Sequence, residues 1–265
     1  MRPVDLLLGL GLSLIGGDHL SIDLGLLGPL DEFGEGDSAH YNKVAPNLCC
    51  VTIPDFDAAG ELAFARELAD LATAVSLPYY NNRSFSLDWK ANHTEVTEAD
   101  RGAELAISTR VLRDRPHHGL FGEEHGLVGD LDSPWRWIVD PIDGTSNFVR
   151  GIPVWASLIA LTHVEHGAVI GVVSAPAMGR NWWAAKGLGA FADGKRCQVS
   201  TVAALDEAQV SVTFSSQWDD LGLTGELVRL QQSAYRARGF GDFWQHMLVA
   251  EGAVDLAVDA VGLQP

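Results

Sequence analysis

The sequence predicts an α/β protein, with helices and strands in mixed order along the chain. Two observations predict this class. Apolar side chains recur at helical spacing in several segments, and two apolar runs are separated only by a short polar turn. Because each helix and each sheet has an apolar face that another element must cover, such a mixture packs in layers. A chain of 265 residues can bury a sizeable core in one or two domains.

The first element expected is a long helix that begins near Asp55. Its apolar side chains share one buried face: Leu62, Phe64, Ala65, Leu68, Ala69, Leu71, Ala72 and Val75. Pro78 is expected to end this helix, because proline lacks the N–H that a helix interior needs. A second helix is expected over residues 100–113, with Thr97 as its N-cap and acidic residues in its first turn.

Strands are expected in the middle of the chain. Residues 135–139 form an apolar run, and Pro141 is expected to end its ladder pairing. The segments 157–164 and 168–175 have the pattern of a hairpin whose turn is Glu165-His166-Gly167. The remaining elements are two weaker strands and two helices, at residues 190–199, 208–215, 221–232 and 243–251.

Residues 1–53 differ in texture from the rest of the chain, being rich in glycine and leucine with an acidic stretch at 31–37. We expect a disordered extension, or a translation start assigned too early, and no function there. The apolar run at 6–15 is too short to span a bilayer, and no small-residue cleavage site follows it cleanly, which argues against a signal peptide. Residues 54–265 then form the folded domain.

The charge of the chain excludes two classes of partner. There are 35 acidic and 18 basic residues, which give a formal charge of −17. Such a protein repels nucleic acid and anionic membranes, so neither is expected as a partner. Cys49, Cys50 and Cys197 have neither the spacing of a zinc site nor that of a disulfide framework, which favours reduced thiols and a cytoplasmic protein.

The segment Asp140-Pro141-Ile142-Asp143-Gly144-Thr145 carries the clearest chemical signal. It places two carboxylates, a carbonyl and a hydroxyl within one turn after an apolar strand. Asp140 and Asp143 can then face one cation, and Mg²⁺ prefers such an all-oxygen set. Gly144 lets the backbone approach an anion closely, and a helix that opens at Thr145 favours a phosphate with its free N–H groups. The segment therefore predicts a metal and phosphate site.

Two further acidic elements lie upstream. Glu123 and Glu124 follow Gly122, and one of them is a candidate to complete the metal shell; a solvated pair of loop glutamates is the alternative. The segment 96–100 (VTEAD) has the pattern of a capped helix start, which alone indicates only a cap. Histidines are expected on the surface or in turns, since Mg²⁺ sites favour oxygen: His117, His118, His163 and His166.

These three elements, GEE at 122–124, DPIDGT at 140–145 and VTEAD at 96–100, resemble the motifs of the inositol monophosphatase family of Mg²⁺-dependent phosphatases. The resemblance runs from about residue 56 to the end of the chain. It implies a layered α-β-α-β-α sandwich as the fold. Four segments look most like the histidinol-phosphate phosphatases within that family: 148–157, 182–185, 241–243 and 248–252.

The resemblance also implies a set of metal ligands. Glu123, Asp140 and the carbonyl of Ile142 would hold a first Mg²⁺ ion, and Asp140 would bridge to a second ion that Asp143 also holds. Asp100 would support the hydroxyl of Thr145 or hold a weaker third ion. Two or three Mg²⁺ ions are therefore expected.

Catalytic and substrate-binding roles follow from the same resemblance. Thr145, together with Glu123, would orient the attacking water. The backbone N–H groups of Gly144 and Thr145 would hold phosphate oxygens. Asp242 would face the amine of the substrate. Arg238 is a candidate substrate contact, with a place on the flank of a helix as the equal alternative.

The chain departs from the family pattern in two ways. Family members continue into a Trp-Asp motif where this sequence ends at Pro265, so we expect the final part of the fold and one ligand of the second metal to be missing. Asp255 and Asp259 lie close to this end, but nothing in the pattern assigns either to that role. Ser146 stands where these phosphatases usually carry lysine, a loss of positive charge that weakens the expected hold on the substrate.

The expected function is that of a Mg²⁺-dependent phosphomonoesterase, which uses a metal-activated water to convert L-histidinol phosphate to L-histidinol and phosphate in histidine biosynthesis. An inositol-1-monophosphatase is the alternative within the family. A truncated, inactive remnant that binds metal or phosphate is the alternative of another class. The expected partner is a small phosphorylated substrate, and the resemblance also admits a homodimer.

Overall fold

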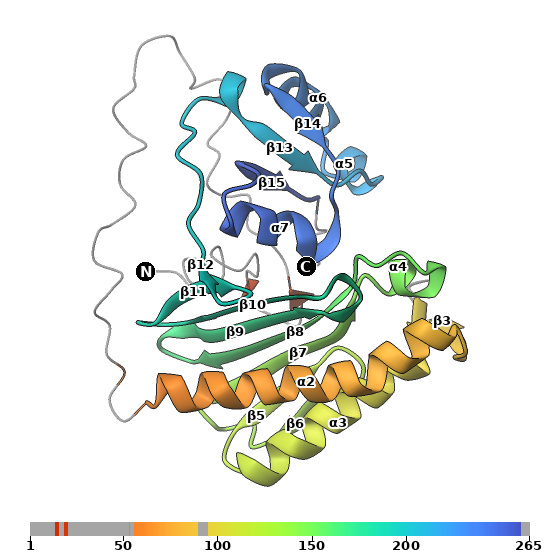
Figure 1. The fold of residues 1–265 in the computed structure, drawn as a ribbon, viewed down its shortest axis with the longest axis vertical. Helices are drawn as coiled ribbons and strands as arrows, with labels where there is room; N and C mark the ends of the chain where they lie inside the picture. Colours follow the sequence, from red (N-terminus) through yellow and green to blue (C-terminus); the bar gives the residue numbers. More distant parts are fainter. Residues whose placement is uncertain (1–13, 16–18, 21–52, 54–55, 90–94, 261–265) are drawn as a thin grey trace.

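The computed structural model describes residues 14–15, 19–20, 53, 56–89 and 95–260. Its main body has five layers, stacked along the long axis of the molecule in Figure 1. Two helices cover the outer face of a large sheet, a third lies between this sheet and a smaller one, and two more cover the smaller sheet. These helices are, in layer order, α2 (Ala58–Asn82), α3 (Glu98–Asp114), α7 (Asp242–Ala250), α5 (Gln217–Asp220) and α6 (Thr224–Ser233). The predicted α-β-α-β-α sandwich is confirmed.

The large sheet has eight strands in the order β12-β11-β10-β9-β8-β7-β5-β6. Neighbouring strands are antiparallel except β5 and β7, which are parallel. The bounds are β5 (Gly119–Gly122), β6 (Gly126–Gly129), β7 (Trp135–Asp143), β8 (Ala156–His163), β9 (Gly167–Ala175), β10 (Arg180–Ala185), β11 (Gly189–Ala192) and β12 (Lys195–Arg196). β8 and β9 form the predicted hairpin, with His163 opposite Gly167.

The smaller sheet has three parallel strands in the order β14-β13-β15. Their bounds are β13 (Gln209–Val212), β14 (Arg236–Arg238) and β15 (Leu256–Val258). The strand expected over residues 190–199 is divided into β11 and β12, because Asp193 and Gly194 make a turn with φ of +49° and +81°. The shorter elements are β3 (Leu87–Trp89), β4 (Glu95–Thr97), α4 (Thr145–Arg150) and the 3₁₀ turns η3 (Pro176–Met178) and η4 (Leu205–Glu207).

Two prolines do not end the elements that they were expected to end. α2 continues past Pro78 to Asn82, because the residues after the proline have tertiary partners. The Tyr80 ring packs against Trp155 at 5.4 Å between centroids, and its hydroxyl donates to the carbonyl of Gly151. β7 likewise continues past Pro141, where the pairing with β8 shifts register and no N–H from the proline is needed.

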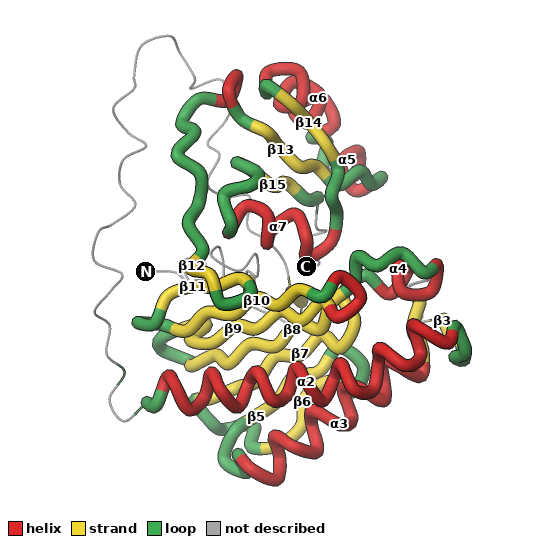
Figure 2. Tube along the Cα trace, viewed as in Figure 1, coloured by secondary structure: helices red, strands yellow, loops and turns green. Residues whose placement is uncertain are grey.

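Buried apolar residues on α2 pack the helix against the large sheet. Ala65, Leu68 and Ala72 are fully buried and belong to one core cluster with Ile159 and Trp137 of the sheet. Burying a leucine side chain of this kind contributes about 1.5–3 kcal/mol. Figure 2 shows α2 and α3 side by side on this face, so the layer that carries Asp100 is fixed to the sheet that carries Asp140.

Most of the predicted N-terminal extension lies outside the described residues, so its disorder stays a prediction. Leu14–Ile15 (β1) and His19–Leu20 (β2) are described and pair as two short antiparallel strands. Of the helices that the structure describes, none is both long enough and apolar enough to cross a membrane.

Candidate active site

Two neighbouring strands bring the GEE and DPIDGT motifs together. β5 and β7 run parallel with Gly122 opposite Val139, so the residues that follow this pair emerge at the same edge of the sheet. The N–H of Glu123 donates to the carbonyl of Val139 at 3.1 Å. A hydrogen bond joins the carboxyl groups of Glu123 and Asp140. Glu123 is exposed, yet its carboxyl group contacts the second motif instead of standing alone in a solvated loop.

The DPIDGT segment folds into a compact turn. The N–H of Ile142 donates to Asp140 Oδ1 at 3.0 Å, and the Thr145 hydroxyl lies 3.0 Å from the carbonyl oxygen of Ile142. Gly144 has φ of +81°, and a Cβ atom there would lie only 3.0 Å from the carbonyl oxygen of Val154. α4 begins directly after Gly144, so the N–H groups of its first turn have no partners inside the helix.

Asp100 serves both the helix cap and the site. It is fully buried at the third position of α3, and its Oδ2 accepts hydrogen bonds from the Thr97 N–H at 2.9 Å and the Thr97 hydroxyl at 2.5 Å. Its other oxygen, Oδ1, lies 3.2 Å from the Thr145 hydroxyl. The capping role of Thr97 is confirmed, and the same carboxylate links α3 to the DPIDGT turn.

The start of α7 contributes two more groups to this region. The N–H of Phe243 donates to Asp143 Oδ2 at 2.9 Å. Asp242 Oδ2 accepts a hydrogen bond from Asn147 Nδ2 at 2.6 Å. The helix that lies between the two sheets therefore begins against the carboxylates of the large sheet, and it brings Asp242 close to Asp143.

Burial and mutual repulsion perturb these carboxyl groups. Desolvation raises the pKa of Asp140 well above its usual range, and the charges of Glu123 and Asp143 raise it further. Desolvation and the charge of Asp242 raise the pKa of Asp143 to about 7, although the Phe243 N–H opposes this shift. Burial also raises the pKa of Asp100 and of Asp242. The cluster thus holds more negative charge than its surroundings stabilise.

A divalent cation fits this donor set. Glu123, Asp140 and Asp143 supply carboxylate oxygens, and the carbonyl of Ile142 lies on the same turn. Hard cations such as Mg²⁺ take oxygen ligands, and a positive charge here would relieve the repulsion that raises the pKa values of Asp140 and Asp143.

The sequence pattern assigned Asp259 no role, but the structure places this residue beside the cluster, where its charge acts on Asp143. It follows β15, and its carboxylate accepts a hydrogen bond from Gln245 and lies 3.0 Å from Nε2 of His246. Burial alone would raise the pKa of Asp259, but hydrogen bonds from His246, Thr213 and Gln245 outweigh it, so the pKa is lowered overall. Its charge in turn raises the pKa of Asp143 and Asp242. The available sequence signal was the position of Asp259 directly after the apolar strand β15, since carboxyl ends of parallel strands often carry site residues.

Glu104 is a residue that sequence reasoning missed. It is fully buried on α3, and its carboxylate accepts hydrogen bonds from the backbone N–H groups of Glu124 at 2.7 Å and His125 at 2.8 Å. The His125 ring nitrogen Nδ1 lies 2.7 Å away. A Cβ atom on Gly122 would lie 2.2 Å from this carboxylate, so the glycine of GEE is required for the approach.

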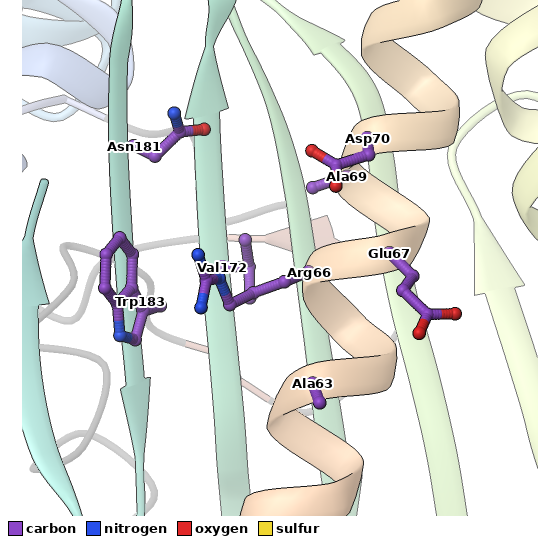
Figure 3. A pocket seen from close by; sticks show the side chains of 8 residues that line it. All are labelled: Ala63, Arg66, Glu67, Ala69, Asp70, Val172, Asn181 and Trp183. Carbon is purple, nitrogen blue, oxygen red and sulfur yellow. The ribbon is translucent and has the colours of Figure 1, made fainter. Parts of the chain in front are cut away.

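Among the contacts of the described residues, no hydrogen bond or ion pair joins Arg238 to these carboxylates. It is exposed at the end of β14, where its guanidinium donates to the carbonyl of Ala237 at 2.6 Å. A separate cavity of about 270 Å³ lies between α2 and strands β9 and β10. Figure 3 shows Arg66 extending from α2 toward the sheet, with its guanidinium 4.3 Å from the ring centre of Trp183. This cavity contains no residue of the three acidic motifs.

The chain is similar in sequence to known phosphatases. The histidinol-phosphatase of Mycobacterium tuberculosis is 47% identical over 206 residues, covering 75% of this chain and 78% of the relative. That of Streptomyces coelicolor is 40% identical over 215 residues, covering 78% and 79%. An inositol-1-monophosphatase of Caulobacter vibrioides is 38% identical over 149 residues, covering 55% and 58%.

The chain also resembles solved structures and matches the pattern of a protein family. The extragenic suppressor protein suhB of Bartonella henselae matches with a TM-score of 0.68 at 30% identity, covering 74% of this chain and 76% of that chain. The pattern of the inositol monophosphatase family matches residues 58–262. The chain therefore belongs to the inositol monophosphatase family.

Proposed function

We propose that this chain is a metal-dependent phosphomonoesterase that hydrolyses L-histidinol phosphate to L-histidinol and phosphate, a step of histidine biosynthesis in the cytoplasm. Its family and its relatives are phosphatases. The two histidinol-phosphatases match three quarters of the chain or more, whereas the inositol-1-monophosphatase matches 55% of it.

The metal ligands in this proposal are Glu123, Asp140, the carbonyl of Ile142, and Asp143. Dependence on Mg²⁺ is general in the family, and we propose two or three ions, the third near Asp100. Such ions, when bound, lower the pKa of a water and neutralise charge on the phosphoryl group.

The other groups position the water and the phosphate. The Thr145 hydroxyl is held by Asp100 and the carbonyl of Ile142, which leaves its lone pairs to orient the attacking water together with Glu123. The N–H groups of Gly144 and Thr145, at the start of α4, hold phosphate oxygens. Water is the nucleophile, so no covalent intermediate with the enzyme is needed.

The observation that carries the choice of substrate is the second pair of carboxylates. Asp242 and Asp259 lie close enough to Asp143 to raise its pKa, but they belong to the smaller sheet and to α7 rather than to the DPIDGT turn. L-histidinol phosphate carries an ammonium group beside its phosphate ester, and inositol phosphate carries no cation. Carboxylates beside the metal ligands therefore favour the amino alcohol electrostatically. Arg238, four residues before Asp242, stays a candidate contact for the substrate.

The test is phosphate release from L-histidinol phosphate and from inositol 1-phosphate, each with Mg²⁺ and with EDTA. We expect release only with Mg²⁺, and kcat/KM at least about tenfold higher for L-histidinol phosphate. Faster turnover of inositol phosphate would identify the alternative within the family. Folded protein that binds Mg²⁺ in calorimetry but releases no phosphate would identify an inactive remnant. The same preparation, run on a sizing column, tests the proposed homodimer.

A pair of variants tests the role of Asp242. Asp242→Asn is expected to raise KM for L-histidinol phosphate by about tenfold, because one charge beside the ammonium is lost, and to leave KM for inositol phosphate nearly unchanged. Asp132→Asn is the matched control, because Asp132 is exposed in the loop before β7. Equal effects of Asp242→Asn on both substrates would contradict the assignment.

A further inference from the structure

Three side chains that bind transition metals lie together at the turn between β8 and β9. His163, Glu165 and His166 each offer one ligand atom, and these atoms all lie within 4.8 Å of one another. We propose that this turn is a second metal site, separate from the carboxylate cluster. It is selective for a divalent ion of intermediate softness, such as Zn²⁺. Imidazole nitrogens with one carboxylate suit Zn²⁺, whereas Mg²⁺ requires oxygen ligands.

The backbone of the hairpin brings the three side chains to one side. The N–H of His166 donates to the carbonyl of His163 at 3.1 Å, which closes a tight turn, and Gly167 follows with φ of +65°. The turn is also held from outside, because the N–H of Val164 donates to the carbonyl of Pro134 at 2.9 Å. The two histidines are therefore three residues apart in sequence and adjacent in space.

Ring contacts restrict the orientation of both imidazoles. The ring of His163 meets Trp135 edge-on at 4.5 Å between centroids, and the ring of His166 stacks on His163 at 4.7 Å. Trp135 is itself stacked on Phe56 at 4.8 Å. A ligand that is already restrained loses less conformational freedom when it binds, so this support favours metal binding.

One hydrogen bond within the turn competes with a metal for the His163 ring, because the N–H of Glu165 donates to Nδ1 of His163 at 3.1 Å. This single exposed bond is a small loss against three bonds to a metal. Three protein ligands leave a further position for water.

The proposed site is far from the carboxylate cluster. His163 is opposite Trp135, the first residue of β7, while Asp143 is the last. Eight residue steps at about 3.3 Å each separate these ends by roughly 26 Å. Zn²⁺ bound at the hairpin therefore cannot be a ligand-sharing extension of the Mg²⁺ site.

The test is Zn²⁺ binding by calorimetry in excess Mg²⁺, which occupies the carboxylate cluster. The wild-type chain is compared with His166→Ala, Glu165→Gln and the control His117→Ala, an exposed histidine elsewhere. We expect wild type and His117→Ala to bind one Zn²⁺ ion more than His166→Ala, and Glu165→Gln to bind it about tenfold more weakly. Equal stoichiometry and affinity in wild type and His166→Ala would overturn the proposal.

A second measurement reports the place of the bound metal. Because His163 contacts Trp135, Cu²⁺ at this site should quench part of the tryptophan fluorescence. The quenching is expected in wild type and His117→Ala, and it should disappear in both His166→Ala and Trp135→Phe. Quenching that persists in His166→Ala would place the metal elsewhere. Since the three ligands lie at a surface turn, circular dichroism of these turn variants should match wild type.

Discussion

Replacement of Glu104 by glutamine should weaken both the fold and the binding of Mg²⁺. The buried carboxylate accepts two backbone N–H groups at 2.7 and 2.8 Å and faces the His125 ring nitrogen at 2.7 Å. These N–H groups belong to the two residues that directly follow Glu123, a proposed metal ligand. Glu104 therefore fixes the backbone next to Glu123 and is not itself a proposed ligand.

The magnitude follows from the number of donors. A hydrogen bond to a charged group contributes about 1.5–3 kcal/mol, and glutamine keeps one acceptor oxygen while its NH₂ group faces a backbone N–H. One hydrogen bond to a backbone N–H is then lost, and the buried NH₂ group of the glutamine points at that N–H, donor against donor. We expect Glu104→Gln to lower the free energy of unfolding by about 2–4 kcal/mol. A loop shift that costs Mg²⁺ binding about 1.4 kcal/mol would raise the Mg²⁺ midpoint about tenfold.

The assay has two readouts, urea unfolding and the Mg²⁺ dependence of phosphate release. A purely structural role predicts lower stability with an unchanged Mg²⁺ midpoint; the positioning role predicts a higher midpoint with kcat at saturating Mg²⁺ within about threefold of wild type. Glu207→Gln is the matched control, because Glu207 is exposed in η4. If Glu104→Gln does not fold, His125→Ala removes only the half-exposed donor and tests the same contact. An unchanged unfolding free energy and midpoint would refute the reasoning.

Three further predictions concern the carboxylate turn. Asp140→Asn should lower kcat by about 10³-fold or more, because in the proposed arrangement this residue is a ligand of two ions, and near-normal turnover would contradict that role. In EDTA, the chain should lose stability as pH rises from about 4 to 7: the pKa of Asp143 is about 7 in the fold, against 3.8 as its ordinary value, so the native state binds the extra proton in this window. Urea midpoints at pH 5 and pH 7.5 check this, and Mg²⁺ should remove the difference. Gly144→Ala should destabilise the fold by about 1–2 kcal/mol, since the residue has φ of +81° and a Cβ atom would lie 3.0 Å from the carbonyl of Val154. Thermal unfolding measures this loss. The control is Gly222→Ala, at a positive φ without a close neighbour, which separates backbone strain from crowding.

Local patterns were enough to predict most of the elements. The apolar spacing of α2, the cap at Thr97 and the β8–β9 turn depend on contacts within a few residues, and all three appear in the structure. The three acidic motifs were readable for the same reason, because each is a short run of residues with its own turn or cap chemistry.

Local rules failed where distant residues altered the outcome. Pro78 lies inside α2 because Tyr80 and Arg83 bind the segment around Phe148, which is far away in sequence. Pro141 lies inside β7 because the register shift leaves no ladder bond for the proline to break. In both cases the tertiary structure offsets the free-energy cost of a proline inside a helix or a strand, a cost that local rules alone assign in full.

The sequence by itself determined the family to which the chain belongs, and it predicted the oxygen donors of the proposed site and their order. Only the tertiary structure decided which other groups surround them. Glu104 and Asp259 belong to no motif, and they reach the site through the packing of α3 on the GEE loop and through the parallel pairing of β13 with β15. The physical reason is that a short motif encodes its own turn, whereas the neighbours of a buried carboxylate are set by how sheets and helices stack.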